Sequence, residues 1–229
     1  MLTKVYKLST FNRRAAGVKY CLINQHNLVE TNEQVQRIAK LRSMYNNEEY
    51  LRKKNMVGKS AEDKDEVMNL INKLDTRAKA ISIVNLITAN RPSEMLLLKI
   101  SDFDLDNKSV TVMMKKQKEM KIKRLTLEAV HLVKASIREY DLKENDLFVG
   151  KVDKWDNYSS VAISDSAYRK TIHKWLGFAP YTLRKTQITA MHEAGADIAT
   201  IAKQSGHKSL ETITKHYLEV NDTTVDKYL

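Results

Sequence analysis

The chain has 229 residues, enough for one sizeable domain or for a large and a small one, and 42% of them are hydrophobic, which excludes disorder by composition. Six glycines and two prolines among long amphipathic stretches favour a mainly helical α+β fold. The single cysteine, Cys21, excludes an intrachain disulfide and is typical of a reducing, cytoplasmic compartment. The first residues lack the apolar core of a signal peptide, and no apolar run is long enough to span a membrane.

The net charge of +11 is concentrated near the N-terminus. Residues 1–57 hold 11 Lys and Arg against 4 Asp and Glu, a net charge of +7, and residues 58–229 carry only +4. Because a basic arm beside a nearly balanced body attracts polyanions, we expect a nucleic-acid partner. The alternative is a charge excess that serves solubility.

The N-terminal segment predicts two helices. Residues 9–28 form a basic amphipathic pattern, with Ser9 or Thr10 as the N-cap. Residues 31–46 predict a second helix.

A basic stretch without helical period, residues 52–59, predicts a linker that contains the boundary between a domain 1–57 and a domain 58–229. The pattern then becomes helical again, with Ser60 as the N-cap and with Glu62 and Asp63 in the first turn.

The remainder predicts more helices and one β-hairpin. Two helices lie within residues 77–100 and are interrupted near Asn90–Arg91–Pro92, where Pro92 suits a first helical turn. Two β-type runs, residues 109–116 and 120–127, predict a hairpin. Further helices are predicted over residues 126–140, 164–178, 181–195 and 197–206, capped by Thr126 and Ser164 and stopped by Gly195 and Gly206.

Several residues have two possible interpretations, one functional and one purely structural. Arg91 precedes a helix start and could help to bind phosphate, or could be an ordinary surface arginine. Arg184 shares a helical face with Ile188 and Met191, so it needs an anion or a salt-bridge partner in the core. By themselves, His207 indicates a helix-end donor and Tyr217 a core side chain.

In combination, three segments resemble the tyrosine recombinase (phage integrase) family: "TANRPSEMLLLKISD", "YTLRKT" and "SGHKSLETITKHY". The family's boxes are similar to "TGLRxSELLxLxxxD", H-x-x-R and "GHxSxxTTxxxY". The match runs from about Gly58 to the end of the chain, and its order and spacing are specific. The matching positions are Arg91, Glu94, Leu98, Asp102, Arg184, His207 and Tyr217.

The sequence departs from the family in two respects. Tyr181 stands where the H-x-x-R box has its histidine. The segment "STFNRRAAGVKYCLI" is similar to the final helix of the family's DNA-clamping, core-binding domain, whose earlier helices would precede Ser9. The sequence is therefore expected to be either a truncated form or a naturally short member.

The resemblance implies transfer of a DNA phosphodiester to Tyr217 and back, with no cofactor and no catalytic metal. Arg91 and Arg184 would clamp the nonbridging oxygens, and His207 would hold or accept the proton of Tyr217. Tyr181 would donate a hydrogen bond to the phosphate or position Arg184. Glu94 would orient the site, or would serve only as a carboxylate at a helix N-terminus.

The family's general acid is a lysine on the hairpin. Counting back from "LTL" gives Lys118, which we prefer, and counting forward from "VTV" gives Lys116. The alternative is that these lysines only contact phosphate.

The resemblance further implies a mainly α catalytic domain with a small antiparallel sheet, and a homo-oligomer on double-stranded DNA, with a dimer per site and a tetramer in the synapse. We expect an integrase of a mobile element. The alternatives are a chromosome-dimer resolvase or DNA invertase, a type IB topoisomerase, and a DNA-binding regulator that does not cleave.

Overall fold

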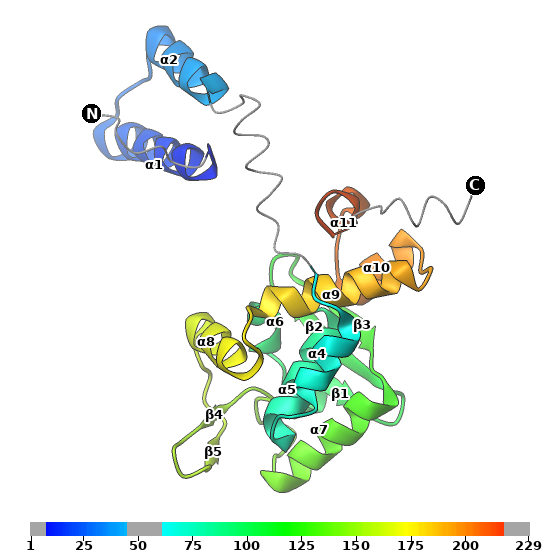
Figure 1. Ribbon diagram of the computed structural model, residues 1–229. Helices are drawn as coiled ribbons and strands as arrows, with labels where there is room; N and C mark the ends of the chain where they lie inside the picture. Colours follow the sequence, from blue (N-terminus) through cyan, green and yellow to red (C-terminus); the bar gives the residue numbers. More distant parts are fainter. Residues whose placement is uncertain (1–7, 45–60, 218–229) are drawn as a thin grey trace, which may run out of the picture. The chain divides into compact units, whose positions relative to one another are not determined.

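The computed structural model describes residues 8–44 and 61–217 (Figure 1). The chain divides into two compact units, Met1–Gly58 and Lys59–Leu229. The predicted linker, residues 52–59, and the predicted cap Ser60 lie outside the described residues. The functional division into 1–57 and 58–229 stays a prediction.

The first unit contains helices α1 (Leu8–His26) and α2 (Asn32–Ser43), which confirms both predicted helices. The prediction of Ser9 or Thr10 as an N-cap was wrong, because α1 already includes Leu8. Thr31 caps α2 in a reciprocal box, in which its hydroxyl accepts from the Gln34 amide and the Gln34 side chain accepts from the Thr31 amide.

The second unit is built around helix α5 (Thr76–Thr88), which contacts α4 (Lys64–Ile71), α7 (Leu127–Glu139) and α9 (Pro180–Glu193). Most of α5 is buried, since apolar side chains surround it on several sides. The prediction that Glu62 and Asp63 lie in the first turn of α4 was wrong. Asp63 is the N-cap, and its carboxylate accepts from the Asp65 and Glu66 amides.

The predicted break after α5 is confirmed. Ala89 ends α5 in the left-handed conformation, with φ of 48°, and Arg91 is the extended N-cap of the short helix α6 (Pro92–Met95). Pro92 occupies the first helical turn, where its missing amide hydrogen costs nothing. This break turns the chain out of the core and leaves Arg91 on a fixed corner.

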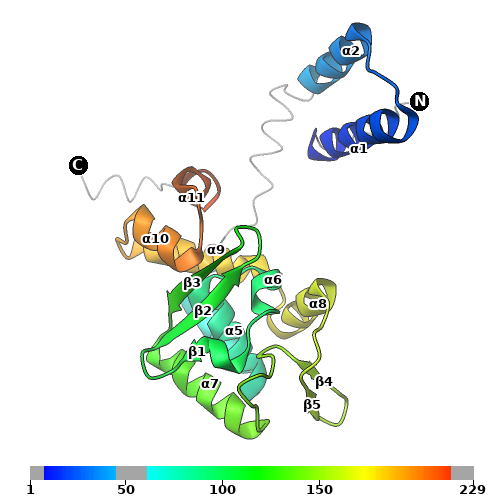
Figure 2. The same ribbon diagram turned by 180° about the vertical axis from the view of Figure 1, so that it is seen from behind.

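A three-stranded antiparallel sheet covers part of α5 (Figure 2). The predicted hairpin is confirmed as β2 (Ser109–Met114) and β3 (Glu119–Arg124), and β1 (Phe103–Asp104) pairs with β2 after the 3₁₀ turn Ile100–Asp102. A second hairpin, β4 (Lys151–Val152) and β5 (Tyr158–Ser159), was not predicted, because two residues are too few to carry an alternating pattern.

The later helices follow the predicted caps. Thr126 caps α7, and Ser164 caps α8 (Asp165–Leu176). After α9 come α10 (Ile198–Ser205), which ends at left-handed Gly206, and α11 (Leu210–Tyr217). A small separate cluster joins these last helices to the end of α5 through Ala89, Ile188, Ile201, Ala202 and Ile213.

The predicted fold class, mainly helical with a small antiparallel sheet, is confirmed. Within the described ranges, no helix has the length and apolar character that crossing a membrane requires.

Candidate active site

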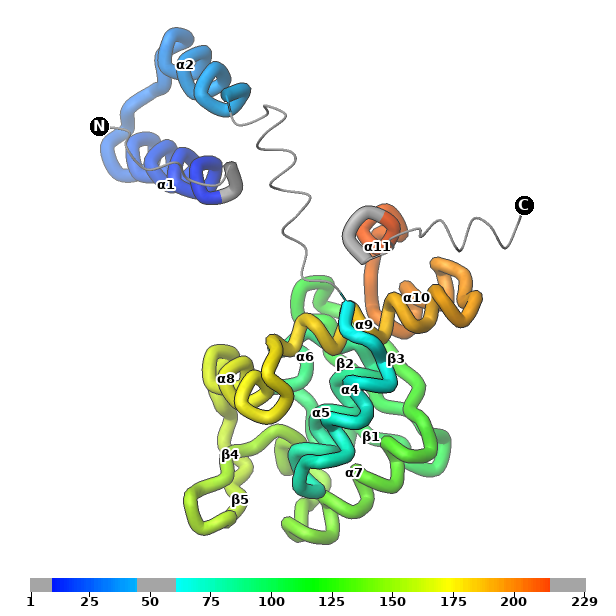
Figure 3. Tube along the Cα trace, in the orientation of Figure 1, coloured from blue at the N-terminus to red at the C-terminus, as the bar shows by residue number. Residues whose placement is uncertain are grey.

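Four segments that are distant in sequence meet at one polar centre of the second unit. They are the α5–α6 corner, strand β3, helix α9 and the α10–α11 connection, which Figure 3 distinguishes by colour along the chain.

Arg184 lies at the middle of this centre, on α9, and its side chain is fully buried. One terminal nitrogen donates to the Ala89 carbonyl and, at 2.9 Å, to the Ser205 carbonyl. The other lies 2.9 Å from Nε2 of His207. Ile188, on the predicted apolar face of α9, is buried below it. The guanidinium is thereby held in one orientation by the ends of α5 and α10.

His207 follows Gly206 at the end of α10 and is also buried. Its Nδ1 lies 2.7 Å from the Ser205 hydroxyl, which itself donates to the Ile201 carbonyl. The hydroxyl therefore accepts from Nδ1, and Nε2 accepts from Arg184, which assigns the neutral tautomer protonated on Nδ1. Burial, followed by the positive charge of Arg184, lowers the pKa of His207 to about 3.

Arg91 is a partly exposed cation of the site, with 22% of its side chain accessible to solvent. Its guanidinium lies 2.8 Å from the carboxylate of buried Glu94, and its amide donates to the same carboxylate at 2.9 Å. Partial burial acts to lower the pKa of Arg91, but Glu94, with a contribution from the Tyr181 hydroxyl, raises it overall. Glu94 thus orients Arg91. Because α6 has only four residues, this guanidinium, and not a helix end, supplies the attraction for an anion.

Tyr181 is at the start of α9, one turn before Arg184, and its side chain is 44% exposed. It interacts with Arg91. The structure therefore places Tyr181 beside the partly exposed Arg91, at the rim of the site.

Lys123 was not predicted as a site residue, and its side chain is fully buried on β3. Its Nζ is 2.9 Å from the Thr88 carbonyl, 2.6 Å from Oδ1 of Asn90 and 3.4 Å from the Ser205 carbonyl. Burial lowers the pKa of its ammonium to about 7 despite the attraction of Glu94. Cross-strand pairing could have revealed it, because Lys123 lies opposite inward-facing Val110.

The two predicted hairpin lysines, Lys116 and Lys118, are exposed in the turn between β2 and β3, and Lys118 has a left-handed φ of 55°. Between them, Gln117 donates to the Gly206 carbonyl at 3.1 Å. The structure therefore places this turn against the residue that precedes His207, but does not bring either lysine into the buried centre.

Tyr217 is the last residue of α11, and its side chain lies outside the described residues. The helix is anchored by Ile213, which is buried against α9 and α10. The backbone at Tyr217 thus belongs to a helix that packs on α9, which carries Arg184, and on α10, which ends just before His207.

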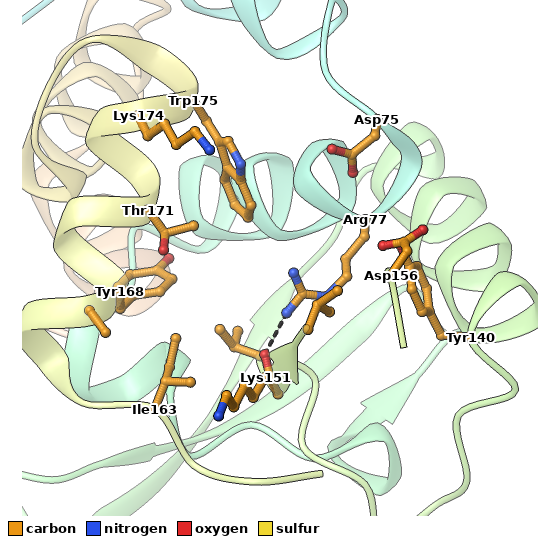
Figure 4. A pocket seen from close by; sticks show the side chains of 14 residues that line it. Asp75, Arg77, Tyr140, Lys151, Asp156, Ile163, Tyr168, Thr171, Lys174 and Trp175 are labelled. Carbon is orange, nitrogen blue, oxygen red and sulfur yellow. Dashed lines mark hydrogen bonds between the residues drawn. The ribbon is translucent and has the colours of Figure 1, made fainter. Parts of the chain in front are cut away.

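The polar centre is distinct from a cavity of about 490 Å³ at the other end of α5 (Figure 4). That cavity is lined by Arg77, Tyr140, Lys151 and Trp175, among others, and Arg77 donates to the Gly150 carbonyl at 2.6 Å. It shares no lining residue with the centre around Arg184. Among the described residues, no group of three or more His, Cys, Asp or Glu side chains is arranged to hold a metal ion.

Comparisons with known proteins bear on the family and the fold of the chain. The family model described as the phage integrase family matches residues 60–224. The tyrosine recombinase XerH of Helicobacter pylori is 26% identical over 167 residues, which are 66% of this chain and 45% of XerH. The chain thus spans less than half the length of this curated relative.

Two solved structures show the same fold. The crystal structure of XerA recombinase is 24% identical, with a TM-score of 0.62 over 96% of this chain and 85% of that chain. XerH bound to a palindromic difH substrate, in a post-cleavage complex, is 18% identical, with a TM-score of 0.58 over 75% of this chain and 52% of that chain. The resemblance inferred from the three boxes is confirmed.

Proposed function

Because the chain belongs to the phage integrase family, we propose that it is a site-specific DNA recombinase, an integrase of a mobile element. It cleaves and rejoins DNA strands through a covalent 3′-phosphotyrosyl intermediate on Tyr217. The observation that carries the proposal is the convergence of Arg184, His207 and the Glu94-oriented Arg91 on one centre.

Arg91 and Arg184 stabilise the charge that develops on the nonbridging phosphate oxygens. Arg184 is held by two backbone carbonyls, and Arg91 is held by Glu94. Donors that are fixed before the reaction need no reorganisation when the charge appears, and their interaction with the phosphate oxygens strengthens as that charge develops.

His207 is the candidate acceptor for the proton of Tyr217. Its lowered pKa keeps the imidazole neutral at physiological pH, so it is not an acid before DNA binds, and Nε2 takes the phenol proton only once its hydrogen bond from Arg184 is released. Tyr181 holds the outer side of Arg91 in this scheme. Lys118 is the proposed general acid, delivered to the leaving 5′ oxygen when the hairpin turn meets DNA, with Lys116 as the alternative.

The phosphotyrosyl bond conserves the energy of the broken phosphodiester, so this scheme needs neither ATP nor a catalytic metal. The partner is double-stranded DNA, and the similar fold of XerH bound to a difH substrate supports this part of the proposal. We propose a dimer on each site, a tetramer in the synapse, residues 1–57 as part of the DNA clamp, residues 58–229 as the catalytic domain, and a cytoplasmic location.

The test is covalent capture on a suicide substrate. A pool of nicked duplexes with randomised sequence is incubated with the full chain, resolved on a denaturing gel, and the trapped DNA is sequenced. A covalent band with an enriched sequence supports the recombinase. Specific binding without any band favours a regulator that does not cleave, for which Tyr181 in place of the family's histidine is the supporting observation.

A further inference from the structure

The ammonium of Lys123 connects three parts of the chain that are remote in sequence. Its acceptors are the Thr88 carbonyl at the end of α5, Oδ1 of Asn90 in the following corner, and the Ser205 carbonyl at the end of α10. A protonated lysine has three N–H donors, and here three acceptors surround it.

The same backbone segments carry the proposed catalytic residues. Asn90 directly precedes Arg91, and Ser205 lies two residues before His207. The Ser205 carbonyl also accepts from Arg184, so Lys123 and Arg184 share one acceptor. The position of this ammonium is therefore coupled to all three side chains of the proposed phosphate site.

The surroundings of Lys123 do not fit a proton donor to DNA. Its three N–H donors face three protein oxygens, so a proton given to the leaving oxygen would leave one of these buried acceptors without a donor. The surroundings of Lys123 are also not what a contact that only stabilises the fold would need. Burying an ammonium has a large desolvation cost, and replacing a buried charge with an apolar side chain of similar volume is often neutral or stabilising.

We propose that Lys123 is a positioning residue, which holds the ends of α5 and α10 together so that Arg91, Arg184 and His207 act on one phosphate. This inference rests on the proposed recombinase function. It assigns to a buried lysine of β3 a role separate from that of the exposed hairpin lysines.

The role has a dependence on pH. A neutral amine has only two N–H donors for three acceptors, so the connection weakens when Lys123 loses its proton. Glu94 on α6 favours the charged form, whereas Arg184 on α9, Arg91 at the corner and Lys121 on β3 oppose it. The burial that lowers the pKa to about 7 therefore places this change near neutral pH.

The experiment compares Lys123→Met and Lys123→Arg with the wild-type full chain on the captured nicked duplex. We expect Lys123→Met to lower the single-turnover cleavage rate at saturating DNA by about 10²-fold, the size of effect that a misplacement of about 1 Å produces. DNA affinity should be nearly unchanged, and thermal stability near neutral pH should not fall, because the variant removes a buried charge. Lys123→Arg, which keeps the charge, should recover part of the rate and remove the decline of the wild-type rate above neutral pH.

A substrate with sulfur at the bridging 5′ position separates positioning from proton donation. A thiolate leaves without a proton, so the loss in Lys123→Met should be the same for sulfur and oxygen. Rescue by sulfur would overturn the proposal and identify Lys123 as the general acid. Arg77→Met is the matched control, since it removes a partly buried cation bonded to a backbone carbonyl at the opposite end of α5.

A second measurement needs no DNA. In ¹⁵N spectra of the histidines, the wild-type protein should show His207 as the single tautomer protonated on Nδ1, and Lys123→Met should shift it toward an exchange average. Unchanged His207 resonances in Lys123→Met overturn the positioning role, whether or not cleavage is observed. Absence of any wild-type covalent adduct, with the His207 change present, overturns the proposed function alone.

Discussion

The guanidinium of Arg184 and the imidazole of His207 are in direct contact, with a terminal nitrogen of Arg184 lying 2.9 Å from Nε2 of His207. The same imidazole bonds to Ser205 through Nδ1. Nδ1 donates its hydrogen bond and Nε2 accepts one. Only the neutral ring can do both, because a protonated ring has two donors and no acceptor. A phosphate that enters beside Arg184 would partly neutralise the guanidinium and make protonation of His207 less unfavourable.

The first prediction concerns this contact. Burial is the larger cause of the lowered pKa of His207, and the charge of Arg184 is the second. We predict that Arg184→Gln raises the pKa of His207 above its present value of about 3 but not to the ordinary value of 6.5, because burial persists. Titration of the histidine resonances by NMR measures this. An unchanged pKa would show that the guanidinium charge is not felt at the imidazole.

The nucleophile is tested by Tyr217→Phe, which removes only the phenolic oxygen at the end of α11. DNA binding should remain within about two-fold, because exposed phosphate contacts elsewhere supply the affinity, and every covalent protein–DNA adduct should disappear. Tyr140→Phe removes the hydroxyl that donates to Asp156, away from the polar centre, and is the control that keeps the adduct. Adduct formation by Tyr217→Phe would place the nucleophile at another residue.

Substitutions of the two exposed hairpin lysines test which of them is the general acid. We predict that Lys118→Ala slows cleavage of normal DNA by ~10²–10⁴-fold, the usual contribution of general acid catalysis, and that a bridging 5′ sulfur removes most of this loss. Lys116→Ala should weaken both substrates alike, as the loss of a phosphate contact does. If sulfur rescued Lys116→Ala and not Lys118→Ala, Lys116 would be the general acid.

Gly206 is tested for its conformation and for the close packing beside His207. Its φ is 74°, and an added Cβ would lie 2.3 Å from Cε of Met114 and 3.5 Å from Nζ of Lys123. We predict that Gly206→Ala lowers the free energy of unfolding by at least ~1–2 kcal/mol, the cost of a left-handed alanine, and also slows cleavage by displacing His207.

Gly195→Ala is the matched control for this effect. Gly195 also has a left-handed φ, of 86°, but its added Cβ would meet nothing within 4 Å. It should lose similar stability without the loss of cleavage, as measured by urea unfolding and by covalent capture. Equal cleavage rates in the two variants would mean that the packing at Gly206 does not position His207.

Lys123 makes stability depend on pH with a definite sign. Its pKa in the folded protein is about 7, below the ordinary 10.5, so between these values the unfolded chain binds one more proton at this position. The free energy of unfolding therefore rises with pH between about 7 and 10.5. Below pH 7, the buried ammonium is fully charged and its destabilising effect on the folded protein is largest. Relative to wild type, Lys123→Met should be most stabilised below pH 7, with the difference shrinking toward pH 10.5.

Urea unfolding of this pair of proteins, in buffers on either side of pH 7, measures the difference directly. Because all other titrating groups are shared, their contributions largely cancel. A difference that is constant across the window would mean that Lys123 keeps the same charge in the folded and unfolded chains throughout.

The sequence by itself determined most of the helices and the identity of the family. Caps such as Thr126 and Ser164 and the breaker Pro92 act on neighbouring backbone groups, so their effect is local and readable from the order of residues. The boxes around Arg91, Arg184 and His207 were recognisable for a related reason, since each keeps a fixed spacing within one short continuous segment of the sequence.

Only the tertiary structure decided what Lys123 does. By polarity alone, Ile122 would be expected to face the core and Lys123 the solvent, but Ile122 is 64% exposed and Lys123 is fully buried. The face of β3 is set by its register with β2, where Lys123 pairs with Val110, which points inward. Burial of this lysine further requires the carbonyls at the ends of α5 and α10 as hydrogen-bond acceptors. Such acceptors come together only when remote segments pack, so local spacing cannot reveal them.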